Sequence, residues 1–257
     1  MISLIRDSEG AAVGDIVTKS PLSSPRPPVM MRQTLERLAV LLAVIGLAYP
    51  ACAAESLPPL KTGDIVFQRT ETNASDAIML ASGTQYTHVG LVEVDSAGRA
   101  NVIEAVGPVR TLPIDRWIKN GNQGRVTIKR VKALGEGDAK KAALRARHYL
   151  GRPYDHFFYE TRDQIYCSEL IYAAFKEGAN ITVGREEKVR ELNIDTGAAQ
   201  QLIKQRWKAH PLCKAKSAGT FKACYSLIME QTLVTPASIA RDPQMELIYT
   251  NFGAGAE

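Results

Sequence analysis

Three residues of the chain carry the side chains that a cysteine nucleophile needs. His88 lies in the segment Thr-His-Val-Gly, Glu104 in Val-Ile-Glu-Ala, and Cys167 in Tyr-Cys-Ser-Glu-Leu. A histidine can take the proton of a thiol and later give it to a leaving group, and a carboxylate can orient that histidine. The sequence therefore indicates nucleophilic catalysis by Cys167, provided that the fold brings the three together.

The residues after Cys167 predict a helix that begins at the thiol. Leu170, Ile171, Ala174 and Phe175 follow it at the third, fourth, seventh and eighth positions, which is the spacing of one apolar helix face. The positive end of a helix stabilises a thiolate, and the free N–H groups of its first turn can donate to an oxyanion. This placement favours a reactive Cys167.

A predicted hairpin brings the other two residues to one face of a sheet. Residues 89–94 and 100–106 have the composition of strands, and the loop between them is typical of a hairpin turn. If the last residue of the first strand pairs with the first residue of the second, His88 and Glu104 are diagonal neighbours on the same face. A slip of one residue would place them on opposite faces.

Each of these residues also has a structural interpretation. A lone cysteine on a helix is usually a small buried hydrophobe, and a histidine beside a strand is usually a core or edge residue. A carboxylate such as Glu104 within an apolar strand requires a partner. A common catalytic role explains the positions of all three residues together, whereas the structural interpretations explain each residue only separately.

Further elements are predicted from apolar patterns and from the residues that end them. Gly178 is expected to end the helix of Cys167, and Asp138 to cap another helix that reaches Leu150. The other expected elements are a buried strand within 60–67, a helix over 75–82, a strand over 124–131 and a helix around 197–207.

The composition bounds the class of protein. Of the 257 residues, 45% are hydrophobic and 23% are charged, which is ordinary for a globular chain with a substantial core. The net charge of +5 is spread along the sequence without a run of five basic residues, which argues against nucleic-acid binding. A loose association with a cell wall or a membrane surface fits this charge equally well.

The N-terminal region predicts export. Residues 1–29 are polar and rich in Ser and Pro, so we interpret them as an over-called start or a disordered extension. Residues 30–54 combine a basic flank, an apolar run of 11 residues and a small-residue cleavage site, as in a signal peptide. Translation is then expected to start at Met30 or Met31, and the protein to be periplasmic or secreted. Cys52 is a weak candidate for lipid modification.

Export changes how the remaining cysteines are interpreted. Cys213 and Cys224 lie close together in a polar stretch that we expect to be rich in loops. In an oxidising compartment these two cysteines are expected to form a disulfide. Cys167 is then the thiol left over, which makes it a candidate reactive residue.

Five motifs in this order resemble the YiiX-like branch of permuted NlpC-type hydrolases with a papain-like fold. The motifs are Thr62-Gly-Asp-Ile-Val-Phe67, Thr87-His-Val-Gly90, Glu104-Ala-Val-Gly-Pro-Val109, Gly151-Arg-Pro-Tyr-Asp155 and Tyr166-Cys-Ser-Glu-Leu170, and the resemblance covers about residues 60–235. In papain-like enzymes the cysteine precedes the histidine, so the reversed order here implies a circular permutation. The implied fold class is α+β, with a small antiparallel sheet packed against the helix that carries the cysteine.

The resemblance also assigns roles and boundaries. It implies His88 as the base, Cys167 as the nucleophile and Glu104 as the third polar member, without a cofactor or a metal. Tyr154 matches an element that faces the substrate, although a packed aromatic is an equal alternative. We expect a catalytic core over 55–185 and a C-terminal extension over 186–257 that completes or caps the fold.

Three functions remain open from the sequence. The first is hydrolysis of a peptide or amino-acyl amide, such as one derived from the cell wall, through a thioester on Cys167. The second is the same thiol chemistry on the acyl group of a lipid, as a hydrolase or an acyltransferase. The third is a catalytically silent binding module of the same fold. The sequence does not set the oligomeric state.

Overall fold

The computed structural model describes residues 56–257 except 73, 160 and 162, and Ser56–Glu257 form one compact unit. The predicted signal peptide, the alternative start and Cys52 lie outside the described residues. Within the described part of the chain, no helix is long and apolar enough to cross a membrane.

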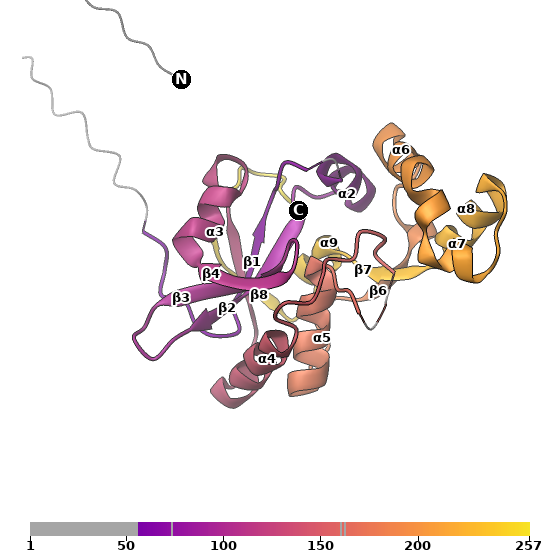
Figure 1. The fold of residues 1–257 in the computed structure, drawn as a ribbon. Helices are drawn as coiled ribbons and strands as arrows, with labels where there is room; N and C mark the ends of the chain where they lie inside the picture. The colour runs from indigo at the N-terminus through magenta and orange to yellow at the C-terminus, as the bar shows by residue number, and fades with distance from the viewer. Residues whose placement is uncertain (1–55, 73, 160, 162) are drawn as a thin grey trace, which may run out of the picture. The chain divides into compact units, whose positions relative to one another are not determined.

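A six-stranded antiparallel sheet forms the centre of this unit (Figure 1). Its strand order is β4-β3-β2-β1-β5-β8, so the last strand of the chain pairs beside β5 at one edge. The strands are β1 (Ile65–Gln68), β2 (His88–Val94), β3 (Ala100–Ala105), β4 (Val109–Pro113), β5 (Thr127–Val131) and β8 (Met245–Thr250). The sequence did not predict β4 or β8.

The β2–β3 hairpin has the register that the sequence predicted. Val94 pairs with Ala100, and Leu91 pairs with Ile103. In this register His88 and Glu104 fall on the same face of the sheet. The expected neighbourhood of the two side chains therefore rests on an observed strand pairing.

Helices cover both faces of the sheet. Helix α3 (Ile114–Asn120) places Trp117 in a cluster with Val66, Val92 and Val102 on one face. Helices α4 (Glu136–His148) and α5 (Cys167–Ala179) pack on the other face (Figure 1). Alternate residues of the buried strands thus enter two different apolar clusters, which explains why these strands are apolar on both sides.

Two predicted helix ends are wrong. Asp138 is the third residue of α4 and does not cap it, because the helix already begins after Gly135. Gly178 lies inside α5, which ends at Asn180 in the left-handed conformation. A Cβ on Gly178 would lie 2.7 Å from the backbone oxygen of Lys141 in α4. This glycine therefore permits the close approach of two helices and is not a helix terminator.

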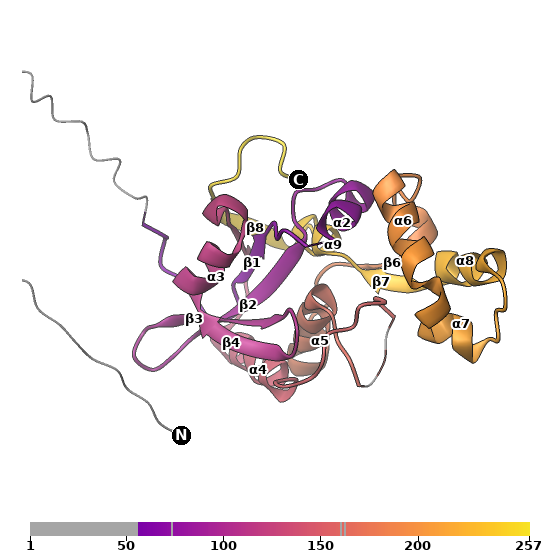
Figure 2. The same ribbon diagram turned by 45° about the horizontal axis from the view of Figure 1, so that its top comes forward.

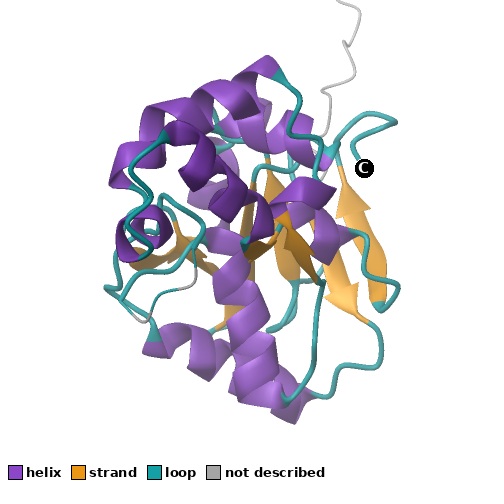
Figure 3. Ribbon diagram, turned by 90° about the vertical axis from the view of Figure 1, so that its right-hand side faces the viewer, coloured by secondary structure: helices purple, strands orange, loops and turns teal. Residues whose placement is uncertain are grey.

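Residues 186–234 form a region that we call the helical cap. It combines a two-stranded sheet, β6 (Glu186–Lys188) with β7 (Thr232–Val234), and the helices α6 (Gly197–Arg206), α7 (Pro211–Ala215) and α8 (Phe221–Glu230). Figure 2 shows α6 beside α2 (Ser75–Ser82), and Figure 3, viewed from the cap side, shows helices in front of the strands.

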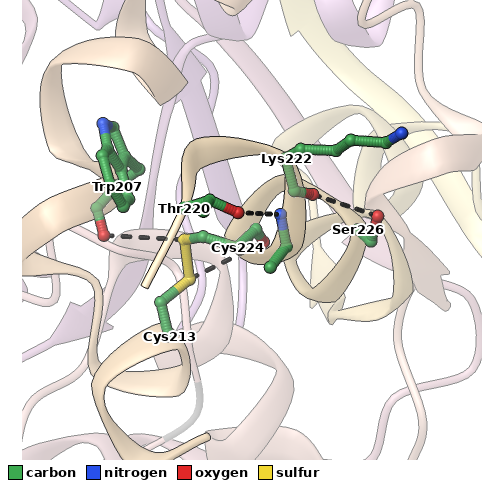
Figure 4. Close-up of a disulfide and its surroundings, with 7 residues drawn as sticks. Trp207, Cys213, Thr220, Lys222, Cys224 and Ser226 are labelled. Carbon is green, nitrogen blue, oxygen red and sulfur yellow. Dashed lines mark hydrogen bonds between the residues drawn. A yellow bond between two sulfur atoms is a disulfide. The ribbon is translucent and has the colours of Figure 1, made fainter. Parts of the chain in front are cut away.

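A disulfide between Cys213 and Cys224 braces the helical cap (Figure 4). The predicted pairing is present in the structure, but its surroundings differ from the expected loops, because Cys213 lies in α7 and Cys224 in α8. Both cysteines belong to a small apolar cluster with Val189, Ile194 and Ile228. A cross-link of this span contributes on the order of 2–3 kcal/mol to stability.

Short elements complete the fold. Helix α9 (Pro236–Ala240) is buried throughout and leads from the helical cap back to β8. Three single-turn 3₁₀ helices lie at Asn122–Gly124, Val189–Glu191 and Trp207–Ala209.

Candidate active site

The structure brings His88 and Glu104 into direct contact. His88 is the first residue of β2, and its Nε2 donates a hydrogen bond of 2.6 Å to Oε2 of Glu104. Both side chains are almost completely buried. Because Nε2 is committed to the carboxylate, Nδ1 is the imidazole nitrogen left for a proton exchange with another group.

Glu104 is held by two further donors that the sequence did not predict. Nε1 of Trp117 donates to Oε2 at 2.9 Å, and Nε of Arg110 donates to Oε1 at 2.8 Å. Arg110 pairs directly with Glu104 across β3 and β4, so recognition of β4 in the sequence would have identified this contact. Burial opposes ionisation, but His88 and Arg110 outweigh it and hold the pKa of Glu104 below its usual value.

Cys167 is the first residue of α5, as predicted, and lies beside His88. The thiol is buried, with 3% of the residue exposed, and it is the one free cysteine among the described residues. Burial raises the pKa of Cys167, but the His88 imidazole, the Val89 backbone N–H and the Tyr154 side chain together lower it below the ordinary thiol value. The helix start thus combines with specific neighbours to favour a thiolate.

The pKa of His88 is raised, whereas that of Cys167 is lowered. Burial disfavours the imidazolium, yet the interactions with Cys167 and Glu104 prevail and raise the pKa of His88 to about 9. A thiolate and an imidazolium can therefore coexist at neutral pH, with Glu104 as the charge that supports the pair. This is the protonation state that thiol nucleophiles use.

Tyr154 lies next to the thiol. It forms an isolated parallel bridge with Ile165, two residues before Cys167. Burial and the charge of Cys167 raise the pKa of Tyr154 well above its usual value, so the phenol stays protonated and can donate a hydrogen bond. The position predicted to face the substrate is thus adjacent to the candidate nucleophile.

The segment after Tyr154 is fixed from two sides. Asp155 accepts hydrogen bonds from the backbone N–H groups of Phe157 at 2.8 Å and Tyr159 at 2.6 Å. From the helical cap, Nε2 of Gln231 donates to the carbonyl oxygens of Phe157 at 3.1 Å and Phe158 at 2.5 Å. The cap therefore helps to shape the wall of the site.

An apolar pocket of about 130 Å³ reaches Cys167. Its walls come from the start of α5, from α2, from the segment after Tyr154 and above all from the helical cap. Cap residues that line it include Val189, Ile194, Ala199, Ile203 and Ile228. Because the cap supplies most of the apolar wall, the strands and helices of the core alone would not form this pocket.

The family model for the "permuted papain-like amidase enzyme, YaeF/YiiX, C92 family" matches residues 59–249. The chain belongs to this permuted papain-like family. This is the family that the five motifs predicted, and the α+β architecture agrees with it. Membership indicates a cysteine hydrolase of the amidase type.

Two relatives support the assignment to the permuted papain-like amidases. The uncharacterised protein YiiX of Escherichia coli K12 is 31% identical over 189 residues, which cover 73% of this chain and 85% of the relative. The crystal structure of YiiX from Escherichia coli O157:H7 superposes with a TM-score of 0.67 at 29% identity and covers 76% of this chain and all of that one.

The YiiX protein of that crystal structure, from Escherichia coli O157:H7, is described as a metalloprotein. In this chain, the described residues contain no group of three or more His, Cys, Asp or Glu side chains placed to hold a metal ion. His88 is also committed to Glu104 through Nε2. The described residues therefore do not fit a metal site of three or more such ligands.

The lowered pKa of Cys167 predicts that alkylation of this thiol begins at an unusually low pH. Iodoacetamide should modify Cys167 at pH values well below the ordinary thiol pKa of about 8.5, because the interactions with His88 favour the thiolate. The rate should be measured from pH 4 to 10 by mass spectrometry of the peptide that contains Cys167.

His88→Asn is the matched variant for this measurement. Without the imidazole, burial dominates, and the alkylation midpoint should move above that of the wild type. An alkylation midpoint at or above 8.5 in the folded wild type would contradict the proposed ion pair.

Proposed function

We propose that the protein is a cysteine amidase in which Cys167 is the nucleophile, His88 the acid and base, and Glu104 the residue that orients His88. The observation that carries this proposal is the hydrogen bond of 2.6 Å between His88 and Glu104 beside a buried thiol with a lowered pKa. Membership in an amidase family supports the same chemistry.

Acylation begins with attack of the Cys167 thiolate on the amide carbonyl carbon. A C–S bond forms and the carbonyl oxygen becomes an oxyanion. When the C–N bond breaks, His88 gives its proton to the departing amine nitrogen, which leaves a thioester and a neutral imidazole. The raised pKa of His88, about 9, ensures that this proton is available at neutral pH.

Deacylation reverses the role of His88. The neutral imidazole takes a proton from water as the water oxygen attacks the thioester carbonyl carbon. The C–S bond breaks, the carboxylic acid leaves, and the thiolate–imidazolium pair is restored. Glu104 stays ionised throughout and stabilises the protonated imidazole.

Two donors are available for the oxyanion. The N–H of Cys167 lies in the first turn of α5, where N–H groups have no partner within the helix. The phenol of Tyr154 lies beside the same thiol and stays protonated. Both donors can stabilise the oxyanion. For Tyr154 this is a contact with the substrate, in keeping with its motif.

The apolar pocket indicates what the substrate carries. Buried apolar side chains from the helical cap surround the space next to Cys167, and the carboxylates of the protein do not line it among the described residues. Such a surface fits a hydrocarbon acyl group better than a polar wall peptide. We therefore place the acyl group of the scissile amide in this pocket. The proposed substrate is then an amide, as in the first of the three functions, with a lipid-like acyl group, as in the second.

Export remains part of the proposal. Residues 30–54 have the pattern of a signal peptide, and the disulfide of the helical cap is typical of proteins from oxidising compartments. A periplasmic or secreted amidase would meet acylated compounds at the cell envelope. N-terminal sequencing of the mature protein tests this, since an intact residue 1 would contradict it.

A series of N-acyl amides with acyl chains from two to twelve carbons tests the proposed function. Each methylene that enters the pocket contributes about 0.8 kcal/mol, so kcat/KM should rise about fourfold per methylene until the pocket is full. Release of the amine is measured for the purified protein without its N-terminal 54 residues.

Ala199→Phe sharpens this measurement because Ala199 lines the pocket and is buried. The added ring should move the preferred acyl length to shorter chains and leave the shortest amide unaffected. Ala209→Phe, at an exposed position of the same region, is the matched control. A kcat/KM that does not depend on acyl chain length would contradict an acyl-binding pocket. The absence of turnover with every amide would favour the binding module.

A further inference from the structure

Arg206 is the one Lys or Arg side chain among the described residues that line the apolar pocket, and no described Asp or Glu lines it. It is the last residue of α6 and is partly buried. A cation in a largely apolar wall is unusual, because a charge that loses water needs a partner. No pattern in the sequence indicated a role for this residue.

The guanidinium is anchored but not neutralised. Its Nη1 donates to the carbonyl oxygen of His156 at 2.6 Å, and Arg206 makes no ion pair with a described residue within 4 Å. Asp155 contributes an attractive charge, but no hydrogen bond or ion pair joins it to Arg206 among the described residues. The remaining N–H donors of Arg206 are therefore available to an anion.

Arg206 lies at the reactive end of the pocket. Arg206 donates to the backbone of His156, and the centroid of the His156 ring lies 5.1 Å from that of Tyr154, the residue beside the thiol. Both Arg206 and Cys167 line the same pocket. Burial lowers the pKa of Arg206, against the opposing effects of Tyr154 and Asp155, as expected for a cation that is short of compensation. An anion bound here would be close to the scissile bond and not at the far end of the acyl chain.

We propose that Arg206 binds the carboxylate of an N-acyl amino acid, so that the protein cleaves amides formed between an apolar acid and an amino acid. This inference rests on the proposed amidase function and specifies its leaving group. In such a substrate the carboxylate is attached to the carbon that bears the amide nitrogen, so it stays near the nucleophile. A guanidinium suits this group because its N–H donors match the two oxygens of a carboxylate.

The test compares a charged substrate with a neutral one. N-octanoylglycine carries the carboxylate, and N-octanoylglycinamide replaces it by an uncharged amide of similar size. Arg206→Gln should lower kcat/KM for N-octanoylglycine by about 10–100-fold, which is the range expected for loss of charge-assisted hydrogen bonds. For N-octanoylglycinamide, kcat/KM should change by less than about threefold.

Two exposed lysines provide the matched controls. Lys204→Gln and Lys208→Gln remove the same charge from the same region outside the pocket lining, so they should leave the preference between the two substrates unchanged. Arg206→Lys should restore part of the preference. If Arg206→Gln weakens both substrates equally, Arg206 acts only by holding the carbonyl of His156, and the proposal is overturned.

A binding measurement separates this proposal from the proposed function. Calorimetry with the Cys167→Ala protein, with and without Arg206→Gln, reports affinity for uncleaved N-octanoylglycine even if the wild type cleaves none of the amides. A loss of affinity that depends on both the carboxylate and Arg206 supports the site. If an N-octanoyl ethanolamine phosphate shows this dependence and N-octanoylglycine does not, the anion is a phosphate and the carboxylate assignment is wrong.

Discussion

Replacing Cys167 with alanine should reduce kcat for N-acyl amide hydrolysis by at least about 10⁴-fold, because the substitution removes the proposed nucleophile. The expected loss is large since the remaining donors, the N–H of residue 167 and Tyr154, can stabilise an oxyanion but cannot attack a carbonyl. The rate of amine release under saturating substrate measures this effect.

The structure indicates that this substitution removes the thiol without disturbing the fold. Cys167 has a small buried side chain at the start of α5, and alanine fits the same space with the loss of one sulfur atom. The far-ultraviolet circular dichroism and the melting temperature should therefore stay close to those of the wild type. Folded protein with unchanged spectra is the condition for attributing the lost rate to chemistry.

Ser168→Ala is the matched control on the same helix. Ser168 is buried and donates a hydrogen bond of 2.8 Å from Oγ to the carbonyl oxygen of Val234, so its loss should lower stability by about 1 kcal/mol. Its kcat should remain within a few-fold of the wild type. Amide hydrolysis that survives in Cys167→Ala would show that the thiol is not the nucleophile.

Replacing Glu104 with glutamine should reduce kcat by about 10³–10⁴-fold, by analogy with the loss of the orienting aspartate in serine protease triads. The carboxylate accepts from His88 and Trp117 at Oε2 and from Arg110 at Oε1. A glutamine has a single acceptor oxygen and an amide N–H group. At least one of the three donors would then lose its acceptor, and His88 would lose the charge that supports its protonated form.

The same substitution should change the pH dependence in a defined direction. Without the Glu104 charge, the pKa of His88 should fall below its value of about 9, and the pKa of Cys167 should rise because a weaker imidazolium stabilises the thiolate less. The alkylation profile of Cys167 should therefore move to higher pH. A purely structural carboxylate would lower stability without this shift.

Glu93→Gln provides the comparison for Glu104→Gln. Glu93 lies on β2 and pairs with Arg147 at the surface, away from the residues around Cys167. The identical chemical change there should leave both kcat and the alkylation profile unchanged, because exposed ion pairs contribute little. Equal effects of the two substitutions would contradict the orienting role of Glu104.

How much of the site was predictable can be judged from the residues themselves. The β2–β3 pairing followed from local composition and a short hairpin, and this register sufficed to place His88 beside Glu104. The helix at Cys167 followed from its apolar spacing. The contacts of Trp117 and Arg110 did not, because they depend on β4 and α3, which carry weak patterns in the sequence.

The errors have physical causes too. The region around Cys213 and Cys224 is polar enough to indicate loops, yet it folds as α7 and α8. Short helices in such a region depend on tertiary packing and the disulfide more than on intrinsic propensity. Gly178 was misassigned since a glycine that ends a helix and one that allows a close contact look alike in a sequence.

The sequence by itself determined the family and the candidate catalytic residues, because the identity and order of His88, Glu104 and Cys167, with the motifs around them, are local properties of the chain. Only the tertiary structure decided what surrounds that chemistry. Arg206 and the apolar wall of the helical cap lie 22–67 residues after Cys167 in the chain. They reach it only because the cap packs against α2 and the segment after Tyr154. Contacts of that separation depend on packing in three dimensions, for which a single sequence carries no local pattern.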